Sequence, residues 1–168
     1  MVSLLVVSLF LALNSKSPAE QVGEMVLKLS TLMSAIEPDY LMVPGDVNST
    51  LSAALAANKL GIPLGHLESG LRSFDRSMPE EINRLLVDEI SNDFFITEQS
   101  GIDNLRKEGK PEKSIHFVGN TMIDTLVGYE SNIEQSDVIE KHKLTKDQFV
   151  LMRKEKIMIS SEDHEGGI

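Results

Sequence analysis

Two carboxylates stand directly after short apolar runs of the sequence, a position typical of catalytic acids and bases. The first run leads through Gly45 into Asp46, and the second, which contains His66, leads into Glu68. One helical segment separates the two runs, so in a parallel sheet their carboxyl ends would lie at the same edge. Two neighbouring carboxylates can act as a general acid and a general base. Structural alternatives exist for both: Asp46 caps the following helix, or Glu68 pairs with Arg72 on the surface.

Positive charge gathers just after these acids, at Arg72, Arg76 and Arg84. The chain as a whole is acidic, with 16 Lys and Arg against 26 Asp and Glu and a net charge of −10. An acidic protein that binds an anionic substrate needs such a local basic cluster. The structural alternative is that Glu80 and Glu81 are ordinary acids of a helix N-terminus, and that Arg84 pairs with one of them along the helix.

Several kinds of site are excluded by composition and by missing motifs. The 168 residues contain no cysteine, which excludes disulfides, thiolate–metal sites and thiol nucleophiles. The acidic balance argues against a surface for nucleic acid or for anionic membranes. The chain has no G-x-G-x-x-G, H-E-x-x-H or G-x-S-x-G motif, and His116 and His142 have no partners at metal-ligand spacing. We therefore expect no cofactor and no metal, and the structural alternative for His66 is a histidine satisfied within the core.

The elements that must position these residues alternate along the chain. Four apolar runs are separated by helix-patterned segments: Tyr40–Val43, Ile62–Leu67, Phe94–Ile96 and Ile115–Val118. Such alternation is typical of βαβ units, so we expect an α/β fold with a Rossmann-like open parallel sheet. Ligands of such sheets bind at the carboxyl ends of the strands, where Asp46 and Glu68 stand.

Local signals place five helices between and around these runs. They are expected over 18–36, from 48 or 49 to Gly61, from Pro79, over 100–108 and from 120 or 121. Pro79 suits a first helical turn, and Gly61 and Gly109 suit helix ends. The apolar spacing of the third helix predicts a buried stripe made of Ile82, Leu85, Leu86 and Ile90.

The chain divides into two parts by composition. Residues 1–129 are predicted to form a partial N-terminal Rossmann-like catalytic domain. Residues 130–168 are predicted to be a charged linker and the truncated start of a further domain. The apolar run Met1–Leu13 is shorter than the roughly 20 residues that span a bilayer, so we expect no membrane association.

A resemblance to a known family lies in the stretch PDYLMVPGDVNSTLSAALAANKLGIPLGHLESGLRSFDRSMPEEINRLLVDEISNDFFITEQS and in the later GNTMIDTL. With its G-H-x-E-[SA]-G-L-R-[ST] and P-E-E-x-N-R blocks in this order, the chain closely resembles the non-hydrolysing UDP-N-acetylglucosamine 2-epimerases, from about Phe10 to Val150. The resemblance implies a GT-B type fold, in which the active site lies between two Rossmann-like halves.

The resemblance also implies the reaction, which interconverts UDP-N-acetylglucosamine and UDP-N-acetylmannosamine. UDP is eliminated to leave 2-acetamidoglucal and is then added back. The matching residues are Asp46, Glu68 and Glu80 as catalytic acids and His66, Arg72 and Arg84 as substrate-binding residues. The family further implies a cytoplasmic location and a homodimer for full-length members.

The chain departs from the family pattern in three places. No stretch matches the family's G-T-R-P-E loop or its H-R-x-E-N motif, and Pro44 stands where the family usually has His or Gln. We therefore expect a partial chain that is inactive by itself. Its sheet would keep an open edge and would lack helices on one face. The alternatives are a non-catalytic remnant that acts as an interaction module, or a fragment of a GT-B glycosyltransferase.

Overall fold

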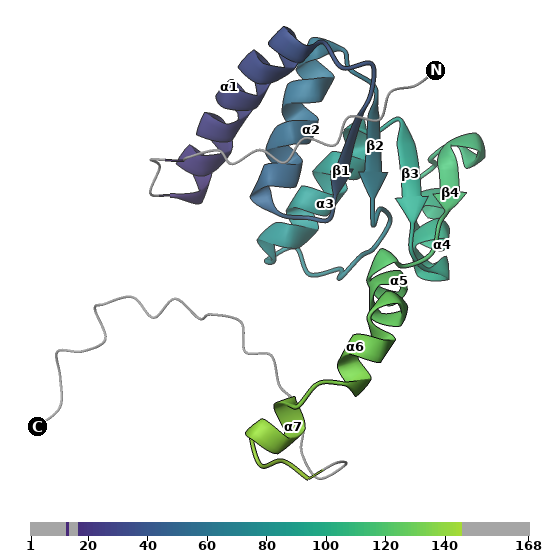
Figure 1. Cartoon of the computed structure of the whole chain (residues 1–168). Helices are drawn as coiled ribbons and strands as arrows, with labels where there is room; N and C mark the ends of the chain where they lie inside the picture. Colours follow the sequence, from purple (N-terminus) through teal and green to yellow (C-terminus); the bar gives the residue numbers. More distant parts are fainter. Residues whose placement is uncertain (1–12, 14–16, 146–168) are drawn as a thin grey trace, which may run out of the picture. The chain divides into compact units, whose positions relative to one another are not determined.

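The computed structural model describes residue 13 and residues 17–145 (Figure 1). The expectations for the apolar start of the chain and for a further domain after residue 145 therefore lie outside the described residues. Two compact units are present, Met1–Asp124 and Thr125–Ile168. The predicted domain boundary at residue 129 stays a prediction.

The first unit is built on a sheet of four parallel strands, which lie side by side in Figure 1. They are β1 (Leu41–Pro44), β2 (Leu64–Leu67), β3 (Asp93–Ile96) and β4 (Ile115–Phe117), in the order β1-β2-β3-β4. The predicted α/β fold with an open parallel sheet is confirmed. Each connection is a crossover to the next strand in the same direction. Because such crossovers are right-handed, the helices between the strands fall on one face.

The helices of this unit begin and end at residues with clear local reasons. They are α1 (Pro18–Ile36), α2 (Asn48–Leu60), α3 (Pro79–Ile90) and α4 (Gln99–Lys107). Ser17 begins α1 through a capping box with Glu20, and Pro18 occupies the first turn. Gly61 ends α2 because its left-handed backbone, with φ of 73°, suits glycine. The predicted helix positions are confirmed to within a residue or two.

The core lies between this helical layer and one face of the sheet. Strand register places Val43, His66, Phe94 and Ile115 in one row across the four strands. Against this face pack Leu51 and Ala54 of α2, Val87 of α3 and Leu105 of α4. The row is therefore apolar except at one position, where the fully buried His66 sits.

The opposite face of the sheet is much less covered within residues 17–124. Burial alternates along β1 and β3, and Met42 keeps 44% of its surface exposed. Tyr40 crosses this face above Gly65 and donates a hydrogen bond of 3.0 Å to Asp93. Burial and this contact with Asp93 raise the pKa of Tyr40 to about 12. Since parallel sheets are usually covered on both faces, the alternation marks a half-covered sheet.

The predicted buried stripe of α3 is wrong. Its buried residues are Glu81, Asn83, Val87 and Asp88, whereas Leu86 is 47% exposed. The other predicted members, Ile82, Leu85 and Ile90, are half-buried. The inner side of α3 meets the ends of the strands and the loop after β2, where backbone N–H groups need acceptors. Buried carboxylates and an amide therefore face inward where an apolar stripe was expected.

The remaining helices are short and exposed. They are α5 (Thr121–Gly128), α6 (Glu130–Glu134) and α7 (Val138–Lys141), after a 3₁₀ turn at Glu112–Ser114. The apolar side chains Met122, Leu126 and Val127 of α5 are each more than half exposed. None of the helices in residues 17–145 combines the length and the apolar character that crossing a bilayer requires.

Candidate active site

Asp46 and Glu68 follow neighbouring strands at the carboxyl edge of the sheet, as the sequence predicts. Pairing continues past the strand ends, because Gly45 donates its N–H to the carbonyl oxygen of Leu67 at 3.1 Å. Gly45 turns the chain with a φ of 65°. A Cβ placed on Gly45 would lie 3.9 Å from Oε2 of Glu68, which brings the Glu68 carboxylate close to the residue before Asp46.

The alternative that Asp46 caps α2 is wrong. The N-cap of α2 is Val47, and no side chain caps this helix end. The Asp46 carboxylate forms an ion pair with Arg84 of α3. Its backbone carbonyl accepts a hydrogen bond of 2.8 Å from the side-chain amide of Asn83. Asp46 is therefore tied to α3 through both its side chain and its backbone.

Arg84 links Asp46 to a buried carboxylate of its own helix. Its Nη1 lies 3.0 Å from Oε2 of Glu81, so the alternative of an ion pair along α3 is confirmed. Arg84 also forms the ion pair with Asp46, so it joins the two carboxylates. Glu81 also accepts the N–H groups of Ser73 and Phe74, at 2.9 and 3.1 Å. Burial alone would raise the pKa of Glu81, but these donors and Arg84 hold it below its ordinary value. Glu81 thereby orders the loop that precedes α3.

Glu68 and Glu80 differ from Asp46 in having no partner. Within residues 17–145, neither carboxylate takes part in a hydrogen bond or an ion pair. Glu80 is exposed in the first turn of α3, and Glu68 is half-buried with a left-handed φ of 64°. A left-handed backbone is uncommon outside glycine, costs about 1–3 kcal/mol, and is found most often at functional sites. Among the described residues, two carboxylates are thus unpaired: Glu68 close to Gly45, the residue before Asp46, and Glu80 in the first turn of the helix that pairs with Asp46.

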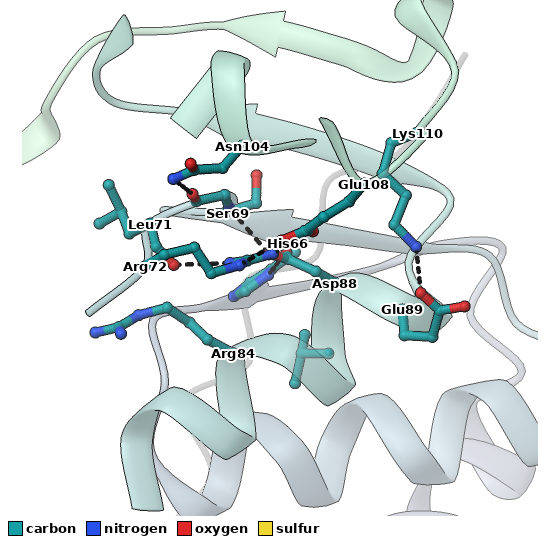
Figure 2. Close-up of polar contacts among 12 residues, drawn as sticks. His66, Ser69, Leu71, Arg72, Arg84, Asp88, Glu89, Asn104, Glu108 and Lys110 are labelled. Atoms are coloured by element: carbon teal, nitrogen blue, oxygen red, sulfur yellow. Dashed lines mark hydrogen bonds and ion pairs between the residues drawn. The ribbon is translucent and has the colours of Figure 1, made fainter. Parts of the chain in front are cut away.

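His66 and Arg72 lie beneath this edge, where Figure 2 shows both side chains pointing toward Asp88. His66 is fully buried, and its Nδ1 lies 2.6 Å from Oδ1 of Asp88. The Arg72 side chain is 2% exposed and lies 2.7 Å from Oδ2 of Asp88 and 2.6 Å from Oε2 of Glu108. The alternative of a Glu68–Arg72 surface pair is therefore wrong. The predicted substrate contacts of His66 and Arg72 stay predictions, and both side chains have partners inside the protein.

The three arginines do not form the basic cluster that their spacing suggests. Arg72 is buried between two carboxylates, Arg84 is paired with Asp46, and Arg76 is exposed in the loop before α3. Positive charge at the edge is thus largely neutralised by the chain's own acids. Among the described residues, no group of three His, Asp or Glu side chains is placed to hold a metal ion.

Sequence reasoning missed Asp88 and Glu81 as organising residues. Both are acids on α3, and with Arg84 between them they recur at steps of three and four residues, which places all three on one side of the helix. This spacing of charged residues can indicate which side of α3 faces inward. The apolar residues of α3 recur at a similar spacing, however, and they indicated a different inner face.

Comparison with known proteins places the chain among sugar-nucleotide epimerases. The family model described as UDP-N-acetylglucosamine 2-epimerase matches residues 2–156. The UDP-N-acetylglucosamine 2-epimerase of Methanococcus maripaludis is 41% identical over 140 residues, which cover 82% of this chain and 38% of that protein. A UDP-2,3-diacetamido-2,3-dideoxy-D-glucuronate 2-epimerase of Pseudomonas aeruginosa is 40% identical over 119 residues, which cover 70% of this chain and 34% of that protein.

A solved structure extends the likeness to the fold. The UDP-GlcNAc 2-epimerase of Methanocaldococcus jannaschii, crystallised with UDP-GlcNAc and UDP, superposes with a TM-score of 0.71 at 40% identity. The match covers 76% of this chain and 35% of that one. The chain thus spans less than half the length of the relatives it matches. With nearly all of its residues inside the family model, the chain belongs to the UDP-N-acetylglucosamine 2-epimerase family.

Proposed function

We propose that this chain supplies the catalytic carboxylates of a non-hydrolysing UDP-N-acetylglucosamine 2-epimerase. The observation that carries the proposal is that Glu68 and Glu80 have no partner among the described residues and lie at the same end of the fold as the Arg84-paired Asp46. Epimerisation at C2 needs one group that removes the proton from one face of the sugar and another that returns it to the other face.

The three acids suit different parts of this reaction. In the forward elimination, the C2–H bond breaks and its proton passes to a carboxylate. The C1–O bond breaks with its electron pair leaving on UDP, and a C1–C2 double bond forms. Glu68 and Glu80 are free to exchange protons in this way. Asp46, held in its ion pair with Arg84, suits a fixed negative charge that stabilises the cationic character developing at C1.

The ion pairs of the arginines also affect how this chain could bind the nucleotide part of the substrate. The diphosphate of UDP requires donors or positive charge, yet Arg72 and Arg84 are both paired with acids of this chain. The proposal therefore assigns most phosphate and uridine contacts to other parts of a complete enzyme and expects the chain to be inactive alone. It also includes the homodimer and the cytoplasmic location implied by the family resemblance.

The substrate of the proposal is a UDP-sugar that carries a 2-acetamido group, with UDP-N-acetylglucosamine and UDP-N-acetylmannosamine as the two epimers. The Pseudomonas relative acts on a UDP-sugar with a further acetamido group and a carboxylate. Both substrates carry UDP at C1 and an acetamido group at C2, so the same elimination is open to each. A comparison of the two substrates in one assay decides between them.

The test is a chimaera with the Methanococcus maripaludis enzyme. The 140 residues that match this chain at 41% identity are replaced by the residues of this chain. Conversion of UDP-N-acetylglucosamine in D₂O is followed by mass spectrometry and NMR, because returning a solvent proton labels C2. We expect turnover with deuterium at C2 from the chimaera, and none from the 168-residue chain by itself.

Substitutions in the chimaera locate the chemistry. Asp46→Asn, Glu68→Gln and Glu80→Gln are each expected to lower kcat by at least about 100-fold, the range for loss of an acid or base or of a fixed stabilising charge. The control is Glu89→Gln, an exposed acid later on α3 that pairs with Lys110. A folded chimaera without turnover would contradict the proposal and favour an interaction module. A chimaera whose turnover is unaffected by all three substitutions would contradict the assignment of these three carboxylates.

A further inference from the structure

We propose that Asp88 is a positioning residue of this site, and that it acts by holding His66 as a doubly protonated, positively charged imidazolium. The part that concerns catalysis rests on the proposed function. The charge state of His66 does not, because it follows from the contacts of its ring. His66 and Asp88 are both buried and bond to backbone groups of Gly45 and Gly70, so the effect is exerted through the backbone.

Each of the two ring nitrogens of His66 lies within hydrogen-bond distance of an oxygen atom. Nε2 lies 2.8 Å from the carbonyl oxygen of Gly45, and a carbonyl can only accept, so Nε2 carries a proton. Nδ1 lies 2.6 Å from Oδ1 of Asp88, and an ionised carboxylate can also only accept. Both nitrogens therefore donate, and the ring is a cation although the residue is fully buried.

The charge of Asp88 depends on the contacts of its carboxylate. Its Oδ2 accepts the N–H of Gly70 at 3.0 Å and lies 2.7 Å from Nη2 of Arg72. Burial would raise the pKa of Asp88, but its hydrogen bond with His66, the charge of Arg72 and the Gly70 N–H hold it below its ordinary value, and Arg72 and Gly70 act whatever the charge of His66. Arg72 is shared with Glu108 of the turn after α4, so two cations face two carboxylates. Leaving the buried charge of Arg72 without its partner would be strongly destabilising, which favours the ionised form of Asp88 beside it.

His66 and Asp88 together hold in place two backbone groups close to candidate acids. Through His66, Asp88 fixes the carbonyl of Gly45, the residue directly before Asp46. Directly, it fixes the N–H of Gly70, two residues after Glu68. The carboxylate of Asp88 thus restrains the backbone next to two of the candidate acids, Asp46 and Glu68.

The charge state is tested on the full chain by long-range ¹H–¹⁵N NMR of the histidine rings at pH 7.5. An ordinary histidine, with a pKa of about 6.5, is mostly neutral there. We expect His66 to show two protonated nitrogens in the wild type and in Glu89→Gln, and a neutral ring in Asp88→Asn. A neutral His66 in the wild-type spectrum overturns the inference even if Asp88→Asn does not fold.

The positioning role is tested in the active chimaera. Asp88→Asn is expected to lower kcat by about 10- to 100-fold, the cost of a small misplacement of catalytic groups, with KM changed less than twofold. Glu89→Gln is expected to leave both unchanged. A folded Asp88→Asn variant with unchanged kcat, or with a raised KM alone, overturns the positioning role. An inactive parent chimaera instead contradicts the proposed function. The NMR measurement then still tests the charge state of His66 by itself.

Discussion

Glu81 and Asp88 are both buried carboxylates of α3 that accept backbone N–H groups from the segment after β2. Glu81 accepts from Ser73 and Phe74, and Asp88 accepts from Gly70. This segment forms no strand or helix, so its N–H groups need acceptors from elsewhere. At the scale of single residues, the loop therefore owes its conformation to side chains of the following helix.

Replacing Glu81 tests this dependence. We expect Glu81→Gln to lower the free energy of unfolding at pH 7 by about 1–3 kcal/mol, because the buried charged acceptor of two N–H groups and of Arg84 is lost. The folded-state pKa of Glu81 lies below its ordinary value of 4.5, so its stabilisation is present above that pH. The stabilisation is lost as the pH falls through the lower folded-state value.

Urea denaturation at pH 7, 5 and 3 measures this effect. The difference between wild type and Glu81→Gln should be largest at pH 7 and should shrink at pH 3. Glu80→Gln is the matched control for stability, because its carboxylate is exposed and adjacent in sequence. Equal losses of stability in the two variants would contradict the role of Glu81.

Backbone strain at Glu68 gives a second prediction at this scale. Glu68 has a left-handed φ of 64°, which glycine adopts at less cost. We expect Glu68→Gly to raise the unfolding free energy of the chain by about 0.5–1 kcal/mol, net of the greater backbone entropy of glycine. In the chimaera, the same change should abolish turnover.

Glu37 is the control for that experiment. It has a φ of 50° at the C-cap of α1, remote in sequence from the candidate acids. Glu37→Gly should give a similar gain in stability with unchanged turnover. If Glu68→Gly destabilises the chain, the left-handed backbone there is not a source of strain.

At the scale of elements, the loop after β2 and α4 approach each other through two glycines. A Cβ on Gly70 would lie 2.4 Å from the carbonyl oxygen of Gly101, and one on Gly101 would lie 2.8 Å from Cγ2 of Ile96. Asn104 of α4 donates a hydrogen bond of 2.9 Å to the Gly70 carbonyl. Side chains at either glycine would force α4 away from the sheet.

Alanine at Gly70 tests this approach. Gly70 and Gly109 share a φ of 77°, but a Cβ on Gly109 meets nothing within 4 Å. We expect Gly109→Ala to cost about 1–2 kcal/mol of stability from backbone conformation alone. Gly70→Ala should cost about 1–3 kcal/mol more from overpacking. Denaturation curves that coincide for the two variants would contradict the close approach.

The sequence predicted the elements well and the contacts between them poorly. Helix positions follow from local signals such as Ser17, Pro79 and Gly61, which act within a few residues. The adjacency of Asp46 and Glu68 follows from a general rule about parallel sheets. The partner of Arg72 does not, because Glu108 lies 36 residues further along the chain and is brought near only by packing.

Strand order places the candidate site at a particular point of the sheet. Asp46 follows β1, which is an edge strand of the order β1-β2-β3-β4. Ligands of open α/β sheets bind where the strand order reverses, and no reversal occurs among the four strands described.

At the scale of the whole molecule, the two compact units are expected to be independent in stability. Nearly all side chains described in residues 122–145 are exposed. A chain that stops at Asp124, the end of the first unit, should therefore unfold within about 2 °C of the full chain in calorimetry. A drop of more than about 5 °C would show that the second unit stabilises the first.

The sheet with one covered face has a consequence for the heat capacity of the chain. Complete domains gain about 12–15 cal/mol/K per residue on unfolding, mainly by exposing apolar surface. Here Met42 and the apolar residues of α5 already contact solvent in the folded state. The gain per residue should fall below that range, which flattens the dependence of stability on temperature. Binding of a partner that covers the open face would raise the heat-capacity gain toward that range, so calorimetry would detect such a partner without any assay of turnover.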